Sequence, residues 1–352
     1  MPIDERLAHL QAVADLPDLT GTRYRLLRRL GRGGMATVYL VEDTALGREA
    51  ALKVLSEPDP SGALAQRLTA EARLLARIEH PNLVPVHDVG ALPDGRIFYV
   101  MQYVRGERLD AWIRRPRTRP EVLRLFVKLA DAVAFAHAQG AVHRDLKPEN
   151  IMVGAFGEAL VMDWGVAKLL GTADVPTLAL PDAGDAAGSA GGGANASVTA
   201  AGTLVGTPAW MAPEQARGEV DRIDARTDVH ALGALLYYLL AGRPPFAGDG
   251  REAIRRVVEE TPASLRGLDP SIPKPLAAIA ARALEKEPAA RYETARALAA
   301  DVERFLDGLP VAAYRESWLE RAGRVLSRSR TLVALLAAYL LMRVIILLFF
   351  GR

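Results

Sequence analysis

Two short segments constrain this chain more than any other feature. The first is the run HRDLKPEN at residues 143–150, and the second is DWG at residues 163–165, which follows an apolar stretch. The spacing predicts two adjacent loops whose side chains can handle a proton or a metal ion. Upstream lie a glycine-rich turn at 31–38 and Lys53 in an apolar strand. In this order, the four elements are the parts that transfer of a phosphoryl group from ATP to a hydroxyl requires.

Lys53 is predicted to bind an anion, because an ammonium group within the apolar run 50–54 is costly without a negative partner. ATP phosphates and a helix carboxylate are two such partners. Glu71 lies beside an apolar stripe in the helix predicted over 62–78 and is the favoured carboxylate, whereas Glu79 at the helix end is the second choice. The glycines of the turn let backbone amides approach phosphates without interference from a Cβ atom.

The HRDLKPEN run offers a base, a cation and a metal ligand. Asp145 is the candidate base that accepts the proton of the attacking hydroxyl. Lys147 can neutralise charge on the transferred phosphoryl group. Asn150 and Asp163 both offer oxygen ligands, which suit Mg²⁺ because this hard cation bridges phosphate oxygens and needs few protein ligands.

The secondary-structure signals divide the chain into two parts. Strand-like runs fill much of residues 24–55 and 84–103, with the helix at 62–78 between them. From Leu109 onward helical periodicity dominates, as at 122–139, 229–241 and 276–285. A β-rich first third followed by a helical remainder implies an α+β fold with two lobes and a cleft between them.

These features, with GTPAWMAPE at 206–214 and DVHALG at 228–233, resemble the eukaryotic-like (Hanks-type) serine/threonine protein kinases of bacteria. The resemblance covers about residues 20–308. It implies a bilobal protein-kinase domain at 23–308, with an N-lobe over about 23–104 and a C-lobe over about 105–308. It also implies transfer of the ATP γ-phosphate to Ser or Thr hydroxyls of proteins, with Mg²⁺ required and Mn²⁺ as a possible substitute.

The resemblance also assigns roles to individual residues. The catalytic residues would be Lys53, Glu71, Asp145 and Lys147, and the metal ligands Asn150 and Asp163. Arg291 would pair with Glu214, and a hydrophobic spine tethered by Asp228 would contain Leu75, Val86, His143 and Trp164. The residues expected to contact ATP are Leu30, Gly31, Arg32, Gly33, Gly34, Met35, Ala36, Thr37 and Val38 of the turn, Ala51 and Lys53 of the next strand, the gatekeeper Met101, the hinge residues Gln102 and Val104, and Met152.

Three positions depart from the family pattern. Ala36 replaces the third glycine of the turn, at the position furthest from the phosphates. Gln102 stands where a glutamate is common, and little consequence is expected because the backbone binds adenine there. Trp164 replaces a phenylalanine in the metal-binding motif, and its larger ring is expected to affect how that motif changes its packing.

The segment 170–203 is rich in glycine, alanine, serine and threonine and has no periodicity. Such a composition predicts a mobile activation-loop insert. Thr203 fits the usual phosphate acceptor best, with Thr199 and Ser197 as alternatives. A phosphate there could pair with Arg144 and Lys168 and order the loop. Autophosphorylation between two copies in a homodimer is one route to it.

The last residues, 331–350, are apolar except for Thr331 and Arg343. A helix of that length spans roughly 30 Å, which matches the hydrocarbon core of a bilayer. Arginines precede it, as expected on a cytoplasmic flank. We therefore expect a basic juxtamembrane linker at 309–330 and one transmembrane helix at 331–350. This places the chain in the inner membrane with the kinase domain in the cytoplasm. A buried or interfacial helix that packs on a partner is the alternative. At the other end, a helical lead is expected at 1–22.

Composition excludes some classes of function. The net charge of +2 does not favour binding to nucleic acid, and the absence of cysteine excludes disulfides and thiolate chemistry. A scaffold that has the fold without activity would be expected to lack Lys53, Asp145 or Asp163, and all three are present. A small-molecule phosphotransferase would lack the 206–214 segment, and a soluble kinase with a protein-docking tail would differ in fractionation.

Overall fold

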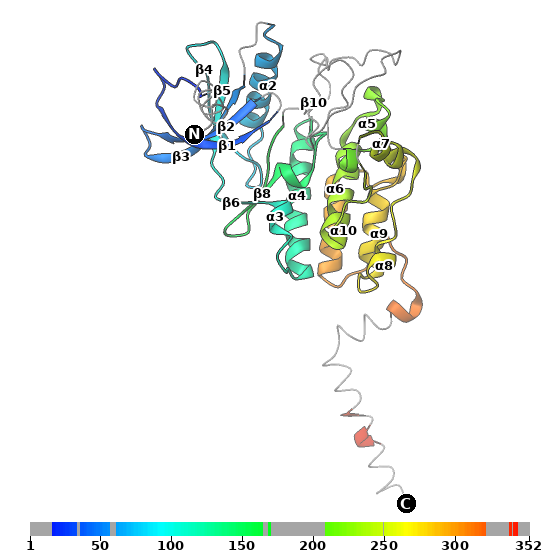
Figure 1. Ribbon diagram of the computed structural model, residues 1–352. Coiled ribbons are helices and arrows are strands. Elements are labelled where there is room, and N and C mark those ends of the chain that lie inside the picture. Colours follow the sequence, from blue (N-terminus) through cyan, green and yellow to red (C-terminus); the bar gives the residue numbers. More distant parts are fainter. Residues whose placement is uncertain are drawn as a thin grey trace, which may run out of the picture.

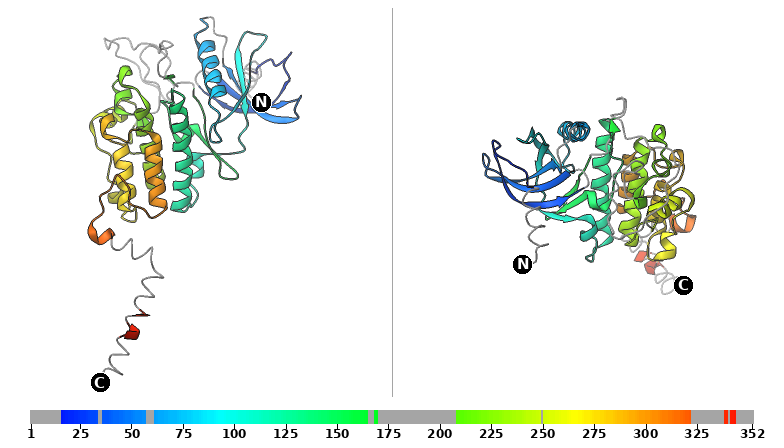
Figure 2. Two further views of the ribbon diagram at one scale, coloured as in Figure 1. Left: turned by 180° about the vertical axis from the view of Figure 1, so that it is seen from behind. Right: turned by 45° about the horizontal axis from the view of Figure 1, so that its top comes forward.

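The computed structural model describes residues 16–33, 36–56, 61–164, 168–169, 208–248, 250–321, 338–339 and 341–343. Within these ranges the chain forms two lobes (Figure 1), one built on a five-stranded antiparallel sheet and the other almost entirely helical. The view from behind shows the single long helix of the first lobe on one side of its sheet (Figure 2). The predicted α+β architecture with a β-rich first lobe is confirmed.

The N-lobe sheet has the strand order β1-β2-β3-β5-β4. Alternation of buried side chains explains its two faces. Ala50, Leu52 and Val54 of β3 belong to a small apolar cluster on one face, whereas Lys53, between them, points to the other face. The strands are β1 (Tyr24–Arg32), β2 (Ala36–Asp43), β3 (Arg48–Leu55), β4 (Val86–Ala91) and β5 (Ile97–Gln102).

Helix α2 (Ala63–Arg77) covers the face of the sheet toward which Lys53 points. Leu68, Ala72 and Leu75 lie on its buried stripe at helical spacing. Glu71 lies on the same stripe and is only 4% exposed, so its carboxylate requires a partner inside the lobe.

Long helices build the C-lobe around one large core. Helix α4 (Arg119–Ala138) begins at a capping box, in which Thr118 accepts from the amide of Glu121 and Glu121 accepts from the amide of Thr118. Helix α6 (Ala225–Ala241) packs between α4, α9 (Lys274–Ala283) and α10 (Ala295–Leu306). The remaining elements are β6 (Gly106–Arg108), α3 (Leu109–Trp112), β7 (Ala141–Val142), η1 (Pro148–Asn150), β8 (Ile151–Gly154), β9 (Ala159–Val161), β10 (Lys168–Leu169), η2 (Pro208–Trp210), α5 (Pro213–Ala216), η3 (Val220–Arg222), α7 (Gly250–Glu259), α8 (Leu265–Leu268) and η4 (Pro288–Ala290).

The loop after α2 ties the two lobes together. The sequence predicted a strand from Val84, but β4 begins at Val86, because the backbone just before it pairs with the other lobe. Leu83 forms a parallel bridge with Val161 of β9, and the side-chain amide of Asn82 donates to the carbonyl of Ala159 at 2.8 Å. This junction holds the end of α2 at a set position relative to the C-lobe.

The two ends of the chain differ in part from expectation. Residues 16–22, predicted within a helical lead, form turns and bends, and residues 1–15 lie outside the described residues. The predicted insert at 170–203 and most of the predicted membrane segment at 331–350 also lie outside them. Within the described ranges, no helix has the length and apolar character needed to cross a bilayer. Beyond α10, the chain keeps contact with the C-lobe as far as Glu320, which accepts from Lys274.

Candidate active site

Lys53 is the centre of a three-residue charge cluster. Its ammonium Nζ donates to both carboxylate oxygens of Glu71, at 2.8 and 3.0 Å, and to Asp163 Oδ1 at 3.0 Å. These residues come from β3, α2 and the loop after β9, so the cluster joins the two lobes. The favoured partner Glu71 therefore pairs with Lys53, whereas Glu79 lies beyond the end of α2 and lines a different hollow.

Electrostatics keeps Lys53 and Asp163 of this cluster ionised. Burial by itself would lower the pKa of Lys53, but the nearby Tyr99, Glu71 and Asp163 hold it well above its ordinary value. The charge of Lys53 in turn lowers the pKa of Asp163, against the effect of its burial. The Asp163 carboxylate is therefore negative at neutral pH, and its side chain is still 53% exposed. An ionised, accessible carboxylate is what a divalent cation requires.

Tyr99 is a member of the cluster that the sequence analysis did not identify. It lies directly opposite Lys53 in the β3–β5 register, and its hydroxyl donates to Glu71 Oε1 at 2.9 Å. Burial raises the pKa of Tyr99 well above its ordinary value, so the hydroxyl keeps its proton and remains a donor. Only the pairing register places it here, and the sequence alone contains no signal for that register.

A second group of predicted site residues, Asp145, Lys147 and Asn150, lies after β7. Lys147 Nζ donates to Asp145 Oδ2 at 2.7 Å. The side-chain amide of Asn150 donates to the Asp145 carbonyl at 2.8 Å and to Asp145 Oδ2 at 3.2 Å. The Asp145 carboxylate is thus held from two sides. Because the Asn150 nitrogen acts as donor, its Oδ1 is the atom that could bind a cation.

A buried aspartate from α6 holds this loop in place. Asp228, which is 0% exposed, accepts from the backbone amides of His143 at 2.7 Å and Arg144 at 2.8 Å. His137 Nε2 lies 2.7 Å from the same carboxylate. Although burial raises the pKa of Asp228, these partners leave it below its ordinary value. The sequence analysis missed His137, whose only signal was its place in the last turn of a helix.

The backbone is strained at both catalytic loops. Arg144 has φ 69° and Asp163 has φ 60°, and they are the only residues other than glycine with positive φ among those described. Each such conformation costs of order 1–3 kcal/mol unless the surrounding structure imposes it. The bonds to Asp228 and to Lys53 supply that constraint, so the site is held in its geometry by tertiary contacts.

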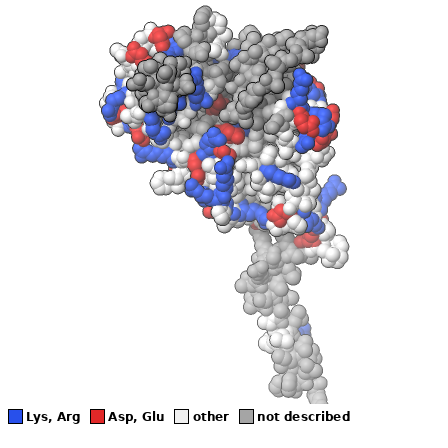
Figure 3. All heavy atoms as spheres, viewed as in Figure 1, with Lys and Arg blue, Asp and Glu red and all other residues white. Residues whose placement is uncertain are grey.

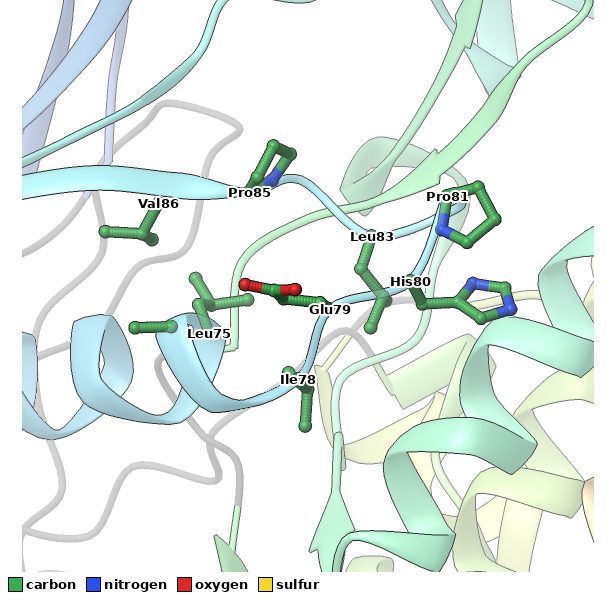
Figure 4. Close-up of a pocket in the computed structure, with 9 residues that line it drawn as sticks. Leu75, Ile78, Glu79, His80, Pro81, Leu83, Pro85 and Val86 are labelled. Carbon is green, nitrogen blue, oxygen red and sulfur yellow. The ribbon is translucent and has the colours of Figure 1, made fainter.

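Two members of the predicted spine, Leu75 and Trp164, belong to the main apolar core, and a third, Val86, packs against it. The rings of His143 and Trp164 lie 4.6 Å apart, and Trp164 is 1% exposed. His143 Nε2 donates to the carbonyl of Met162 at 3.0 Å. Leu75 and Val86 come from the N-lobe, and Figure 4 shows them beside a hollow.

The hollow in Figure 4 lies at the C-terminal end of α2, and Asp145 is not among the residues that line it. Its volume is about 440 Å³, and it opens between the end of α2, the following loop and the start of β4. The rings of His80 and Phe135 pack 5.2 Å apart at its C-lobe edge. It does not contain the charge cluster and is not the candidate active site.

The residues expected to contact ATP come from both lobes. Gly31 pairs with Val38 and Arg32 with Thr37 where β1 turns into β2, and the Gly33 amide donates to the Ala36 carbonyl at 2.8 Å. The predicted contacts Gly34 and Met35 lie outside the described residues. Ala51 on β3 pairs with Met101 on β5, Gln102 ends β5, Val104 follows it, Leu30 lies on β1, and Met152 lies on β8 of the C-lobe.

The predicted pair of Glu214 and Arg291 forms in the interior of the C-lobe. Both side chains are 0–1% exposed, and the guanidinium donates to both carboxylate oxygens at 2.8 and 2.7 Å. The neighbouring Gln215, which the sequence analysis did not single out, donates from Nε2 to the carbonyl of Arg144 at 2.7 Å. The Gln215 bond links α5 to the loop that carries Asp145.

Comparison with known proteins identifies the family of this chain. The chain belongs to the protein kinase domain family, which matches residues 24–302. It is 36% identical to the serine/threonine-protein kinase PknB of Mycobacterium tuberculosis over 331 residues, covering 90% of this chain and 49% of PknB. It is also 34% identical to the serine/threonine-protein kinase PrkC of Bacillus subtilis over 81% of this chain and 41% of PrkC. The chain therefore spans less than half the length of these curated relatives.

A solved structure has the same fold. The crystal structure of the PknI kinase domain of Mycobacterium tuberculosis matches with a TM-score of 0.57 and 26% identity, over 80% of this chain and 96% of that domain. The bilobal protein-kinase fold predicted from the sequence is thus confirmed.

Proposed function

We propose that this chain is a serine/threonine protein kinase that transfers the γ-phosphate of ATP to protein hydroxyls. The observation that carries the proposal is that Lys53 contacts Glu71 and Asp163 at the same time, at 2.8 and 3.0 Å. A lysine paired with the helix carboxylate while the metal-binding aspartate is in place is the arrangement that phosphoryl transfer in protein kinases requires.

Each residue has a role in this reaction. Asp145 accepts the proton of the attacking hydroxyl, and Lys147, which donates to its Oδ2, places positive charge beside the transferred group. Lys53 binds phosphate oxygens of ATP and is oriented by Glu71. The turn at 31–38 supplies backbone amides to the phosphates, and the β5 end supplies backbone groups to adenine.

The oxygen atoms present fit Mg²⁺. Asn150 Oδ1 and the ionised Asp163 carboxylate would hold the cation, with the remaining ligands coming from phosphate and water. When bound, Mg²⁺ would neutralise the charge of the phosphate groups.

Phosphorylation of the chain's own activation loop is part of the proposal. β10 pairs with β7 so that Lys168 is opposite Val142, next to the HRDLKPEN run. That backbone pairing supports a role for Lys168 beside Arg144 in binding a phosphate on Thr203. A homodimer would allow one copy to phosphorylate the other.

We also propose that residues 331–350 anchor the chain in the inner membrane, with the kinase domain in the cytoplasm. The apolar run and the arginines before it support this. The described parts of the run are helical, and there Tyr339, Leu341 and Met342 are 51–63% exposed. Figure 1 draws these short red pieces well away from the C-lobe.

The test measures transfer of labelled phosphate from ATP with Mg²⁺ by the full chain and by its Asp145→Asn variant. Incorporation onto serine or threonine that disappears in the variant supports the kinase. ATP binding without incorporation by either protein would instead favour a scaffold with the kinase fold.

A further inference from the structure

The segment that follows α10 is fixed on the end of the C-lobe. Val311 is 6% exposed and belongs to the main core. The carboxylate of Asp301, itself 1% exposed, accepts from the amides of Ala312 at 2.7 Å and Ala313 at 3.0 Å and from the Tyr292 hydroxyl at 2.8 Å. Because a buried carboxylate is costly without such partners, this capture holds residues 311–313 against the lobe.

Glu320 holds the next turn. Its carboxylate accepts from Lys274 Nζ at 2.8 Å, from the Tyr314 hydroxyl at 3.0 Å and from the Ser317 amide at 2.9 Å. The ammonium of Lys274 and these hydrogen bonds lower the pKa of Glu320 to about 2, so the carboxylate is charged at neutral pH. Residues 317–321 are therefore tied to α9.

The same contacts leave two adjacent apolar side chains facing outward. Trp318 is 77% exposed and Leu319 is 62% exposed, and Arg321 beside them is also exposed. The other tryptophans, Trp112, Trp164 and Trp210, are at most 9% exposed. An outward Trp-Leu pair next to arginine has the composition of a membrane interface, where the ring lies among headgroups.

The short chain segment between this surface and the apolar run at 331–350 points to the membrane as its binding partner. Only residues 322–330 separate the fixed turn from the apolar run at 331–350, and nine residues reach at most about 30 Å. From 321 to 330 the chain carries four arginines and no acidic residue, which favours an anionic surface. Figure 3 shows Lys and Arg atoms, with some Asp and Glu atoms among them, along the lower edge of the C-lobe above the tail.

We propose that this end of the C-lobe rests on the anionic membrane surface, with Trp318 and Leu319 inserted among the headgroups. The inference depends on the proposed membrane anchor and goes beyond it, because it orients the catalytic domain. The N-terminus of α4 lies at the same end, since Arg119 donates to Ser271, close to Lys274. Helix α4 has 20 residues and is therefore about 30 Å long.

The loop that carries Asp145 follows the far end of α4 (Figure 1). The catalytic carboxylate is therefore held about one α4 length, about 30 Å, from the bilayer. Acceptor hydroxyls that this enzyme reaches belong to soluble proteins, or to segments that extend this far from the membrane.

The experiment reconstitutes the full chain in vesicles of phosphatidylcholine and phosphatidylglycerol whose acyl chains are brominated near the headgroup. Bromine quenches the fluorescence of a tryptophan that enters the interface. The variant Trp318→Phe removes the reporter, and its exposed position makes it compatible with the fold. A matched control places a tryptophan on the N-lobe by adding Leu46→Trp to Trp318→Phe, since Leu46 is likewise 61% exposed.

We expect quenching in the unmodified chain and none in Trp318→Phe or in the Leu46→Trp control. Vesicle flotation with unchanged fluorescence in the unmodified chain would overturn the docking while leaving the anchor intact. Failure to float would overturn the anchor and, with it, the docking. A blue shift of Trp318 emission that grows with protein concentration in the absence of lipid would assign this surface to a second copy of the chain.

Discussion

Arg291 and Glu214 form a buried two-point ion pair although 76 residues lie between them in the sequence. Glu214 also accepts from the Thr227 hydroxyl at 2.9 Å, and Arg291 also donates to the carbonyls of Arg226, Lys286 and Glu285. Both charges are therefore saturated with partners, and the pair joins α5, α6 and the segment before α10.

Replacing Arg291 with methionine is expected to lower the free energy of unfolding by about 3–5 kcal/mol, because it leaves the Glu214 carboxylate buried without its partner. Urea denaturation followed by circular dichroism measures this change. Arg222→Met is the matched control, since its ion pairs with Glu219 and Glu287 are exposed and a loss of only about 0–1 kcal/mol is expected. Equal losses of unfolding free energy in the two variants would show that the buried Arg291–Glu214 pair is no more important for stability than an exposed one.

Stability is expected to fall in acid. Burial raises the pKa of Glu214 and of Asp228, but their hydrogen-bonding partners leave both below their ordinary values of 4.5 and 3.8. The unfolded chain therefore binds protons at a higher pH than the folded protein. Their contribution is complete above about pH 4.5 and is lost as the pH falls through the folded-state pKa values.

Urea denaturation midpoints measured from neutral pH downward test whether stability falls in acid. Glu214→Gln should lower the midpoint at neutral pH and make the acid branch shallower. If the urea midpoint of Glu214→Gln fell with decreasing pH as steeply as that of the unmodified chain, other carboxylates would be responsible for the loss of stability in acid.

Asp145→Asn is expected to reduce kcat by about 10²–10⁴, because it removes the base while the contacts of Asp228 keep the loop in place. Steady-state kinetics measures the loss. Asp131→Asn, which removes only a surface pair with Arg296, is the control and should retain activity. Similar activity in the two variants would exclude Asp145 as the base.

Tyr99→Phe is expected to raise the KM for ATP about fivefold, because loss of the hydroxyl bond to Glu71 costs about 1 kcal/mol of positioning for Lys53. The control is Tyr237→Phe, which loses a comparable bond to the Ala263 carbonyl far from the cluster. It should lower stability without changing KM. An equal change of KM in both would indicate a general structural effect.

Thr203→Ala is expected to lower the activity of the purified kinase, because its loop would lack the phosphate that we propose Arg144 and Lys168 bind. Phosphopeptide mass spectrometry of the unmodified chain checks the site, with Thr199→Ala as the comparison. Full activity without any phosphate on the loop would rule out regulation by phosphorylation of the activation loop.

Several features of the fold could be predicted from the sequence because they depend on local patterns. The helices predicted at 62–78, 122–139 and 229–241 correspond to α2, α4 and α6, with shifts of a few residues at their starts. The start of β4 was predicted too early, because Leu83 and Val84 are as apolar as strand residues, while pairing with Val161 directs Leu83 to the other lobe. The three-stranded sheet of β6, β8 and β9 was not predicted, since its strands are too short to show alternation.

The sequence by itself was enough to predict which residues carry the chemistry, because HRDLKPEN, DWG and the lysine strand are short local runs that can be recognised without knowledge of the fold. The tertiary structure alone decided their partners. Pairing of Lys53 with Glu71 rather than Glu79 depends on how α2 docks on the sheet, and Tyr99 joins them through the β3–β5 register. Likewise, the buried carboxylate of Asp301 and burial of Val311 fix residues 311–313 on the C-lobe, and the contacts of Glu320 leave Trp318 exposed. Such contacts join different elements of one lobe, so their geometry arises only when those elements pack against each other.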